Sequence, residues 1–296
     1  GSQPAGEPLQ VTLVQGNQDQ LTKWDAAKVE QRLKTYADLT LPEFGQADLV
    51  VWPENAVTLF YGDLRDYFDR LEGQARSSGT DLMLGVPLRA DDGVNYFTTI
   101  MSLGSEHEFY RKRHLVPFGE FVPFQDQLRG LIAFFDLPMS AFSAGPAGQA
   151  PLSVAGQRAA VSICYEDAFG EEVIANLADA TLLVNGSNNA WYGDSLAPHQ
   201  HLQISRMRAL ETGRPLLRAT TNGISALVDS KGDVLATSPQ FETYLLRGTV
   251  QPRTGLTPYT RWGNIPVLAA VILVAGAGLA AGLALGGRGR RHSGGG

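Results

Sequence analysis

Residues 159–170 read Ala-Ala-Val-Ser-Ile-Cys-Tyr-Glu-Asp-Ala-Phe-Gly and contain Cys164, the only cysteine in 296 residues. The largely apolar run at 159–163 predicts a buried β-strand. The acidic residues that follow Cys164 predict the first turn of a helix. A cysteine at such an elbow lies at the edge of a sheet, where a helix N-terminus lowers the thiol pKa and offers N–H groups to an oxyanion. The alternative is a buried, unreactive cysteine, because free cysteine is among the most buried residue types.

Composition and charge limit the class of protein. The chain is 44% hydrophobic and 18% charged, with a formal net charge of −6, which suits a globular domain with a full core. No basic cluster lies in the part expected to fold, so nucleic acid is not an expected partner. No Cys/His spacing suits zinc, and His199 and His201 stand two apart without sharing a helix face. We therefore expect no metal and no cofactor.

The C-terminal stretch at residues 265–285 is apolar throughout and carries no charge. As a helix it is long enough to cross about 30 Å of hydrocarbon. A buried core helix is the alternative, but such a helix usually has a polar face. Three arginines follow within the glycine-rich tail at 286–296, while Arg261 alone precedes the stretch. The positive-inside rule therefore predicts a cytoplasmic tail and an N-terminal domain on the opposite side of the membrane.

Between a flexible lead at residues 1–8 and this stretch, we expect one catalytic domain at residues 9–255. The predicted strands are 9–14, 49–52, 82–86, 96–103, 108–111, 159–163, 181–185, 216–219, 225–229 and 244–250. The predicted helices are 25–39, 64–78, 171–178 and 198–212. Because several strands form hairpin-like pairs, the pattern favours a mixed sheet layered with helices over a parallel barrel.

Two further residues follow predicted strands, where α/β folds place chemistry. Glu54 comes directly after a buried strand, and partial desolvation there makes a carboxylate a better base. Lys112 follows a third strand. Taken singly, Glu54 reads as a surface glutamate and Lys112 as part of a solvated basic turn. Together with Cys164 they offer a base, a cation for a developing oxyanion and a thiol nucleophile.

Longer motifs carry a resemblance to known proteins. Trp-Pro-Glu at 52–54, Arg-Lys-Arg-His-Leu-Val-Pro-Phe-Gly-Glu at 111–120 and Ile-Cys-Tyr-Glu-Asp at 163–167 are similar to the three catalytic blocks of the carbon–nitrogen hydrolase (nitrilase) superfamily, in the same order. Residues 112–124, residues 188–223 and the apolar C-terminal stretch resemble the apolipoprotein N-acyltransferases of bacterial inner membranes. The likeness covers the chain from about Val11 onward.

This resemblance implies an α/β fold, a four-layer α-β-β-α sandwich with mixed sheets, followed by one transmembrane helix. It also implies a catalytic triad with Glu54 as general base, Lys112 as oxyanion stabiliser and Cys164 as nucleophile. The residues implied beside this triad are Glu120 as accessory glutamate, Tyr165 and Glu166 next to the nucleophile, and Trp24 for binding substrate. Apart from the resemblance, we also expect Phe118, in the apolar segment after Lys112, and Trp191, in a loop rich in Asn and Gly at a strand end, to bind substrate.

The activity implied is transfer of an acyl chain from a membrane phospholipid to a lipoprotein. Cys164 would carry the acyl chain as a thioester and pass it to the N-terminal amine of a diacylglyceryl-cysteine apolipoprotein. The expected location is the bacterial inner membrane, with the catalytic domain on the periplasmic face. Independently of family, the segment at 116–142 is unusually apolar for a loop, which predicts a lid that dips into lipid. The alternative is a loop packed on the domain's own core.

Three other functions stay open. A nitrilase-type amidase would use the same triad to hydrolyse a small amide. A membrane-tethered binding domain would carry the triad without using it. The resembled acyltransferases carry several membrane helices before the catalytic domain and none is expected in this sequence, so a catalytically inactive excised domain is the third.

Overall fold

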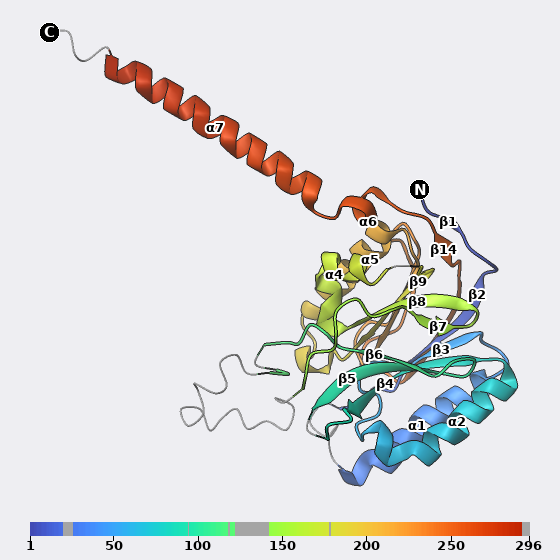
Figure 1. Ribbon diagram of the computed structural model, residues 1–296. Coiled ribbons are helices and arrows are strands. Elements are labelled where there is room, and N and C mark those ends of the chain that lie inside the picture. Colours follow the sequence, from blue (N-terminus) through green and yellow to red (C-terminus); the bar gives the residue numbers. More distant parts are fainter. Residues whose placement is uncertain (20–25, 94, 118, 122–141, 178, 292–296) are drawn as a thin grey trace, which may run out of the picture. The chain divides into compact units, whose positions relative to one another are not determined.

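Figure 1 shows the computed structural model, which describes residues 1–19, 26–93, 95–117, 119–121, 142–177 and 179–291. The chain divides into two compact units, Gly1–Thr257 and Pro258–Gly296. The first unit contains all the residues predicted to take part in catalysis or substrate binding.

The first unit is built around two six-stranded sheets. The first sheet has the order β13 (Tyr244–Val250), β2 (Leu9–Gln15), β3 (Leu49–Val51), β4 (Asp81–Arg89), β5 (Tyr96–Leu103) and β6 (Glu108–Arg111). The second has the order β12 (Val234–Thr237), β11 (Ala226–Val228), β10 (Leu216–Thr220), β9 (Leu182–Ser187), β8 (Gln157–Ile163) and β7 (Leu152–Val154). A short antiparallel pair joins β1 (Gln3–Pro4) to β14 (Arg253–Thr254).

Both sheets are mixed. Strands β2, β3 and β4 run parallel in the first sheet, and β8, β9 and β10 run parallel in the second. Antiparallel strands flank each parallel core. Parallel neighbours present their carboxyl ends along one edge, which is where α/β folds place their sites. Glu54 follows β3 and Cys164 follows β8, so both predicted residues stand at such edges.

Three apolar layers show how the elements pack. One cluster lies between the sheets and includes Val11, Ile100, Val161 and Leu217. A second joins the first sheet to α1 (Val29–Thr40) and α2 (Arg65–Ser78), and a third joins the second sheet to α4 (Gly170–Ala175) and α5 (Ala197–Thr212). Helices cover the outer face of each sheet in Figure 1. The prediction of a four-layer α-β-β-α sandwich with mixed sheets is confirmed.

Some elements differ from their predicted bounds. The helix predicted to start at 25 begins as a 3-10 turn, Ala26–Lys28, and residue 25 lies outside the described residues. Strands β7 and β12 were not predicted, because both are short and β12 has a largely exposed, weakly alternating pattern. The helix predicted at 171–178 is the six-residue α4. Short edge elements carry too little periodicity to be recognised without their neighbours.

The second unit holds α6 (Pro258–Trp262) and α7 (Ile265–Arg291). Within α7, Ile265–Gly282 is long and apolar enough to cross a membrane by length and composition. The apolar stretch predicted from the sequence is therefore one continuous helix.

Gly85 on β4 lies against the loop that carries Glu54, and a side chain there has no room. An added Cβ would stand 2.4 Å from both the Asn55 amide nitrogen and the Pro53 carbonyl oxygen. We expect Gly85→Ala to lower the free energy of unfolding by about 1–3 kcal/mol, since overpacking forces backbone shifts, and to slow any reaction of Cys164. Urea unfolding measures the first effect.

Gly73 on α2 is the matched control, because its added Cβ would meet no atom within 4 Å. Gly73→Ala is expected to stabilise the helix by up to about 1 kcal/mol. Equal stability of Gly85→Ala and the parent chain would contradict the packing described for the Glu54 loop.

Candidate active site

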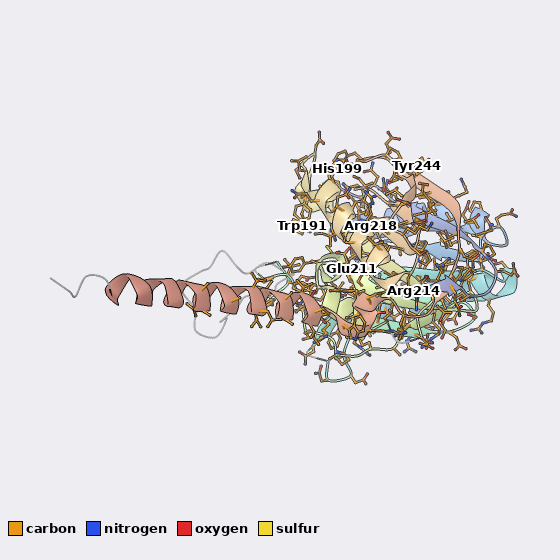
Figure 2. The ribbon with its side chains drawn as sticks, turned by 90° about the horizontal axis from the view of Figure 1, so that it is seen from above. Trp191, His199, Glu211, Arg214, Arg218 and Tyr244 are labelled. Carbon is orange, nitrogen blue, oxygen red and sulfur yellow. The ribbon has the colours of Figure 1, made fainter. Side chains whose placement is uncertain are left out.

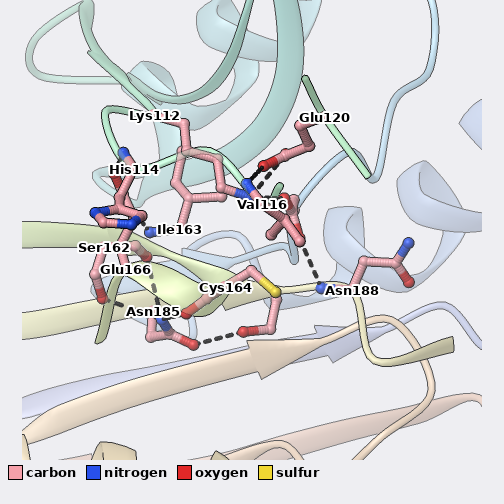
Figure 3. Close-up of polar contacts among 12 residues, drawn as sticks. Lys112, His114, Val116, Glu120, Ser162, Ile163, Cys164, Glu166, Asn185 and Asn188 are labelled. Atoms are coloured by element: carbon pink, nitrogen blue, oxygen red, sulfur yellow. Dashed lines mark hydrogen bonds and ion pairs between the residues drawn. The ribbon is translucent and has the colours of Figure 1, made fainter. Parts of the chain in front are cut away.

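Cys164 stands at a sharp turn between β8 and a short helix. Its φ is 52°, in the left-handed region that non-glycine residues rarely adopt. The next element is a five-residue 3-10 helix, Cys164–Ala168, and α4 begins only at Gly170. The predicted strand-to-helix elbow is present, but its helix is a single tight turn. The Cys164 sulfur and the side chain of Lys112, the residue after β6, appear in the same close-up in Figure 3.

Lys112 is the centre of a buried ion cluster. Its side chain is 1% exposed, and its Nζ donates to Glu54 Oε1 at 2.9 Å and to Glu120 Oε1 at 2.8 Å. The second oxygen of each carboxylate accepts a backbone N–H, that of Asn188 for Glu54 and that of Val116 for Glu120, both at 2.9 Å. Figure 3 shows these contacts in one group beside the Cys164 sulfur. Both carboxylates are therefore held by backbone as well as by the ammonium.

The charges of this cluster act on one another. Burial by itself disfavours the Lys112 ammonium, but Glu54 and Glu120 outweigh it and hold the pKa of Lys112 above its ordinary value. Burial raises the pKa of the Glu120 carboxyl although Lys112 opposes it. The resting cluster thus holds a permanent cation between two acids.

Burial, and after it the negative charge of Glu54, raises the pKa of the Cys164 thiol to about 12. The sequence-based expectation of a lowered thiol pKa was wrong. The physical reason is that the side chain is buried next to carboxylates, while the helix that follows is too short to supply a strong dipole. The resting thiol is therefore protonated at neutral pH and needs a base before it can attack.

Glu166 connects the two sheets by hydrogen bonds close to the ion cluster. Its carboxylate accepts the Ile163 N–H at 2.7 Å, the Arg113 N–H at 2.6 Å and the His114 N–H at 3.0 Å. It also accepts the Tyr110 hydroxyl at 3.1 Å. Because these donors belong to the Cys164 elbow and to the segment that follows Lys112, Glu166 fixes the spacing between the two.

The remaining predicted residues lie apart from the ion cluster or outside the described part of the chain. Tyr165 is 40% exposed, with its ring 4.9 Å from that of Phe169. Trp191 is 61% exposed on the 3-10 turn Ala190–Tyr192 and lies at the surface in Figure 2. Trp24, Phe118 and most of the predicted lid, residues 122–141, lie outside the described residues. Among the described residues, no group of three or more His, Cys, Asp or Glu is arranged to hold a metal ion.

Sequence reasoning missed a buried polar cluster behind Cys164. Arg218 is fully buried in β10 and lies 3.5 Å from Asp167, whose other carboxylate oxygen is 2.9 Å from His201 Nε2. Burial disfavours the Asp167 carboxylate, but His201 and Arg218 outweigh it and lower the pKa of Asp167. One signal was available: Arg218 interrupts the apolar run Leu216–Thr220, and a charge in a buried strand requires a partner.

Comparison with known proteins agrees with this geometry. Residues 10–259 match the family described as carbon-nitrogen hydrolase. The chain is 43% identical over 266 residues to an apolipoprotein N-acyltransferase of Methylococcus capsulatus, covering 90% of this chain and 53% of that protein. It is 46% identical over 276 residues to one of Azotobacter vinelandii, covering 92% and 54%. The chain thus spans about half the length of the curated relatives it matches.

Among solved structures, the fold is similar to that of a CN-hydrolase superfamily protein from Xanthomonas campestris, with a TM-score of 0.60 and 18% identity over 90% of this chain and 97% of that one. At this identity the likeness concerns the fold alone. The fold and the matched residues together show that this chain belongs to the carbon–nitrogen hydrolase family.

Proposed function

We propose that this chain carries the catalytic centre of an N-acyltransferase, in which Cys164 takes an acyl chain from a membrane phospholipid and passes it to the N-terminal amine of a diacylglyceryl-cysteine apolipoprotein. The observation that carries the proposal is the buried Lys112 ammonium, held between Glu54 and Glu120 and acting on the charge of Cys164. The substrates are inferred from relatives whose printed name is apolipoprotein N-acyltransferase.

In the first half-reaction, Glu54 accepts the thiol proton as the Cys164 sulfur attacks the carbonyl carbon of the phospholipid ester. A sulfur–carbon bond forms and the carbonyl oxygen becomes an oxyanion, stabilised by Lys112 Nζ and the Tyr165 N–H. The ester carbon–oxygen bond then breaks. The leaving lysophospholipid oxygen takes the proton from Glu54, which leaves a thioester on Cys164.

In the second half-reaction, the lipoprotein amine attacks the thioester carbon. Glu54 takes a proton from the amine, the sulfur–carbon bond breaks, and the proton passes to the departing thiolate. The products are an amide and the free Cys164 thiol. Because two substrates use one nucleophile in turn, we expect ping-pong kinetics.

The other predicted residues have supporting roles in this scheme. Glu120 holds Lys112 in place and keeps its charge, and Glu166 sets the distance between the Lys112 segment and the Cys164 elbow. Exposed Trp191, with Trp24 and Phe118, is proposed to contact substrate. We place the apolar window of α7 in the bacterial inner membrane, with residues 9–255 as a periplasmic catalytic domain and residues 286–296 in the cytoplasm.

The test is mass spectrometry of the chain after incubation with phospholipid in detergent micelles. We expect a mass increase of one acyl group on the peptide that contains Cys164, and its disappearance when a diacylglyceryl-cysteine peptide is added. Cys164→Ala is expected to show no adduct. An acyl adduct on the Cys164→Ala variant would contradict the thioester mechanism.

A small amide is the substrate that separates this proposal from its nearest alternative. If the chain releases ammonia from simple amides and never acquires an acyl group from phospholipid, it is an amidase of the same family. Failure of Cys164 to react with any ester, amide or thiol probe would instead favour a binding domain.

A further inference from the structure

The buried polar cluster behind Cys164 takes no part in the chemistry described above. It consists of Asp167, Asn185, Asn189, His201, Ser205 and Arg218. All but His201 are at most 2% exposed, and the His201 side chain is 12% exposed. Burying so many polar groups is costly unless each is paired. The cluster therefore needs a reason that packing alone does not supply.

Two side chains of this cluster converge on one backbone atom, the Cys164 carbonyl oxygen. Asn185 Nδ2 lies 3.2 Å from it and His201 Nε2 lies 3.1 Å from it. A carbonyl oxygen can only accept, so both nitrogens act as donors. The peptide that follows the nucleophile is thus clamped by two donors, one from β9 and one from α5.

Arg218 decides which way both donors point. A guanidinium has donors only. Its Nη1 donates to Asn185 Oδ1 at 2.7 Å, which turns Asn185 Nδ2 towards the Cys164 carbonyl. Its Nη2 donates to Asn189 Oδ1 at 3.1 Å, which turns Asn189 Nδ2 towards His201 Nδ1, 3.2 Å away. One buried cation therefore orients two amides.

The same chain of contacts selects the tautomer of His201. Since Asn189 Nδ2 is a donor, His201 Nδ1 must be the acceptor and carries no proton. The ring proton is then on Nε2, which faces the Cys164 carbonyl at 3.1 Å and the Asp167 carboxylate at 2.9 Å. Both are acceptors, so the Nε2–H tautomer satisfies every contact of the ring.

A trans peptide is planar, and its C=O and N–H point in opposite directions. Holding the Cys164 carbonyl from the side of α5 and β9 therefore aims the Tyr165 N–H away from them. We propose that Arg218, acting through Asn185 and His201, is a positioning residue that aims the Tyr165 N–H at the oxyanion formed on the acyl group. This inference rests on the proposed function for the role of Tyr165.

The experiment uses p-nitrophenyl acetate, a donor that acylates a reactive thiol without any phospholipid. We expect His201→Phe to slow the burst of p-nitrophenol by about 10- to 100-fold, as for a small misplacement of a catalytic group, with KM unchanged because the clamp does not touch substrate. His201→Gln keeps an amide N–H near the position of Nε2 and is expected to restore most of the rate. His199→Phe, on the exposed face of the same helix (Figure 2), is the matched control and is expected to react like the parent chain.

A second measurement does not depend on rates, and its main readout uses the parent chain. Nitrogen-15 spectra of the parent chain are expected to show the His201 ring proton on Nε2 and not on Nδ1, with the signal assigned by its loss in His201→Gln. Asn189→Leu is expected to release this preference while leaving the Cys164 side chain intact.

The outcomes separate the two proposals. A folded His201→Phe variant that reacts at the parent rate, or a His201 ring protonated at Nδ1, would overturn the clamp. A parent chain that reacts with p-nitrophenyl acetate but takes no acyl group from phospholipid would defeat the proposed acyl donor, while slow reaction of His201→Phe in the same assay would still support the clamp.

Discussion

Glu54→Gln is expected to slow acylation of Cys164 by about 10²- to 10⁴-fold, the usual contribution of a general base, and at the same time to lower the pKa of the thiol. The loss of the base lowers the reactivity of Cys164, whereas the lower thiol pKa raises it. The variant loses the group proposed to remove the thiol proton. It also loses the negative charge that, after burial, does most to hold the pKa of Cys164 at about 12.

A single cysteine makes this prediction measurable without labels. The ultraviolet absorbance of the thiolate follows the ionisation of Cys164 alone once tyrosine ionisation is subtracted with Cys164→Ala. In the parent chain we expect the thiol to stay protonated until the pH approaches about 12. In Glu54→Gln we expect thiolate to appear at lower pH, because Lys112 then faces Glu120 as its only acidic partner in this cluster among the described residues.

Glu30→Gln, a change of the same kind at an exposed position on α1, should alter neither the titration nor the rate. A Glu54→Gln variant with an unchanged thiol titration would mean that the carboxylate does not act on the sulfur. A normal acylation rate in that variant would remove Glu54 from the mechanism.

Lys112→Met is expected to have the largest effect on stability. The substitution leaves Glu54 and Glu120, both buried, without the ammonium that bonds to each at 2.8–2.9 Å. Removing one partner of a buried ion cluster typically costs about 3–5 kcal/mol of unfolding free energy. Loss of the oxyanion cation is expected to slow acylation by a further 10²- to 10³-fold, in the range known for single oxyanion donors.

The pH dependence of Lys112→Met follows from Glu120. Burial raises its pKa and Lys112 is the largest opposing influence, so the substitution raises that pKa further above the value in the unfolded chain. A group with a raised folded-state pKa contributes stability at low pH, and that contribution is lost as the pH rises through the folded value. Urea unfolding should therefore show the deficit of Lys112→Met to be smallest in mild acid and largest at neutral and alkaline pH.

Lys34→Met is the control, because Lys34 forms an exposed pair with Asp38 one helical turn away. Its loss should cost no more than about 0.5 kcal/mol. A Lys112→Met variant as stable as Lys34→Met at neutral pH would show that the two buried glutamates do not depend on the ammonium.

Much of the fold, and the positions of three residues proposed for catalysis, could be predicted from local pattern. Short apolar runs that stop at Glu54, Lys112 and Cys164 mark strand ends, and α/β topology collects strand ends along common edges. The hairpin-like spacing of the strands predicted the mixed character of the sheets. The uninterrupted apolar stretch at residues 265–285 predicted the continuous helix α7. These features depend on residues close together in the chain, so periodicity is enough to reveal them.

Only the tertiary structure decided the pKa of Cys164 and the contacts among the buried charged side chains. The pKa of Cys164 is raised rather than lowered, because burial and a carboxylate from another sheet outweigh a helix of five residues. Arg218, His201 and Asp167 come from β10, α5 and the Cys164 turn. These elements are far apart in the sequence, so no local sequence pattern predicts that the three side chains are in contact. Solvent exclusion and electric fields depend on distances between elements remote in sequence, and only packing of the two sheets sets those distances.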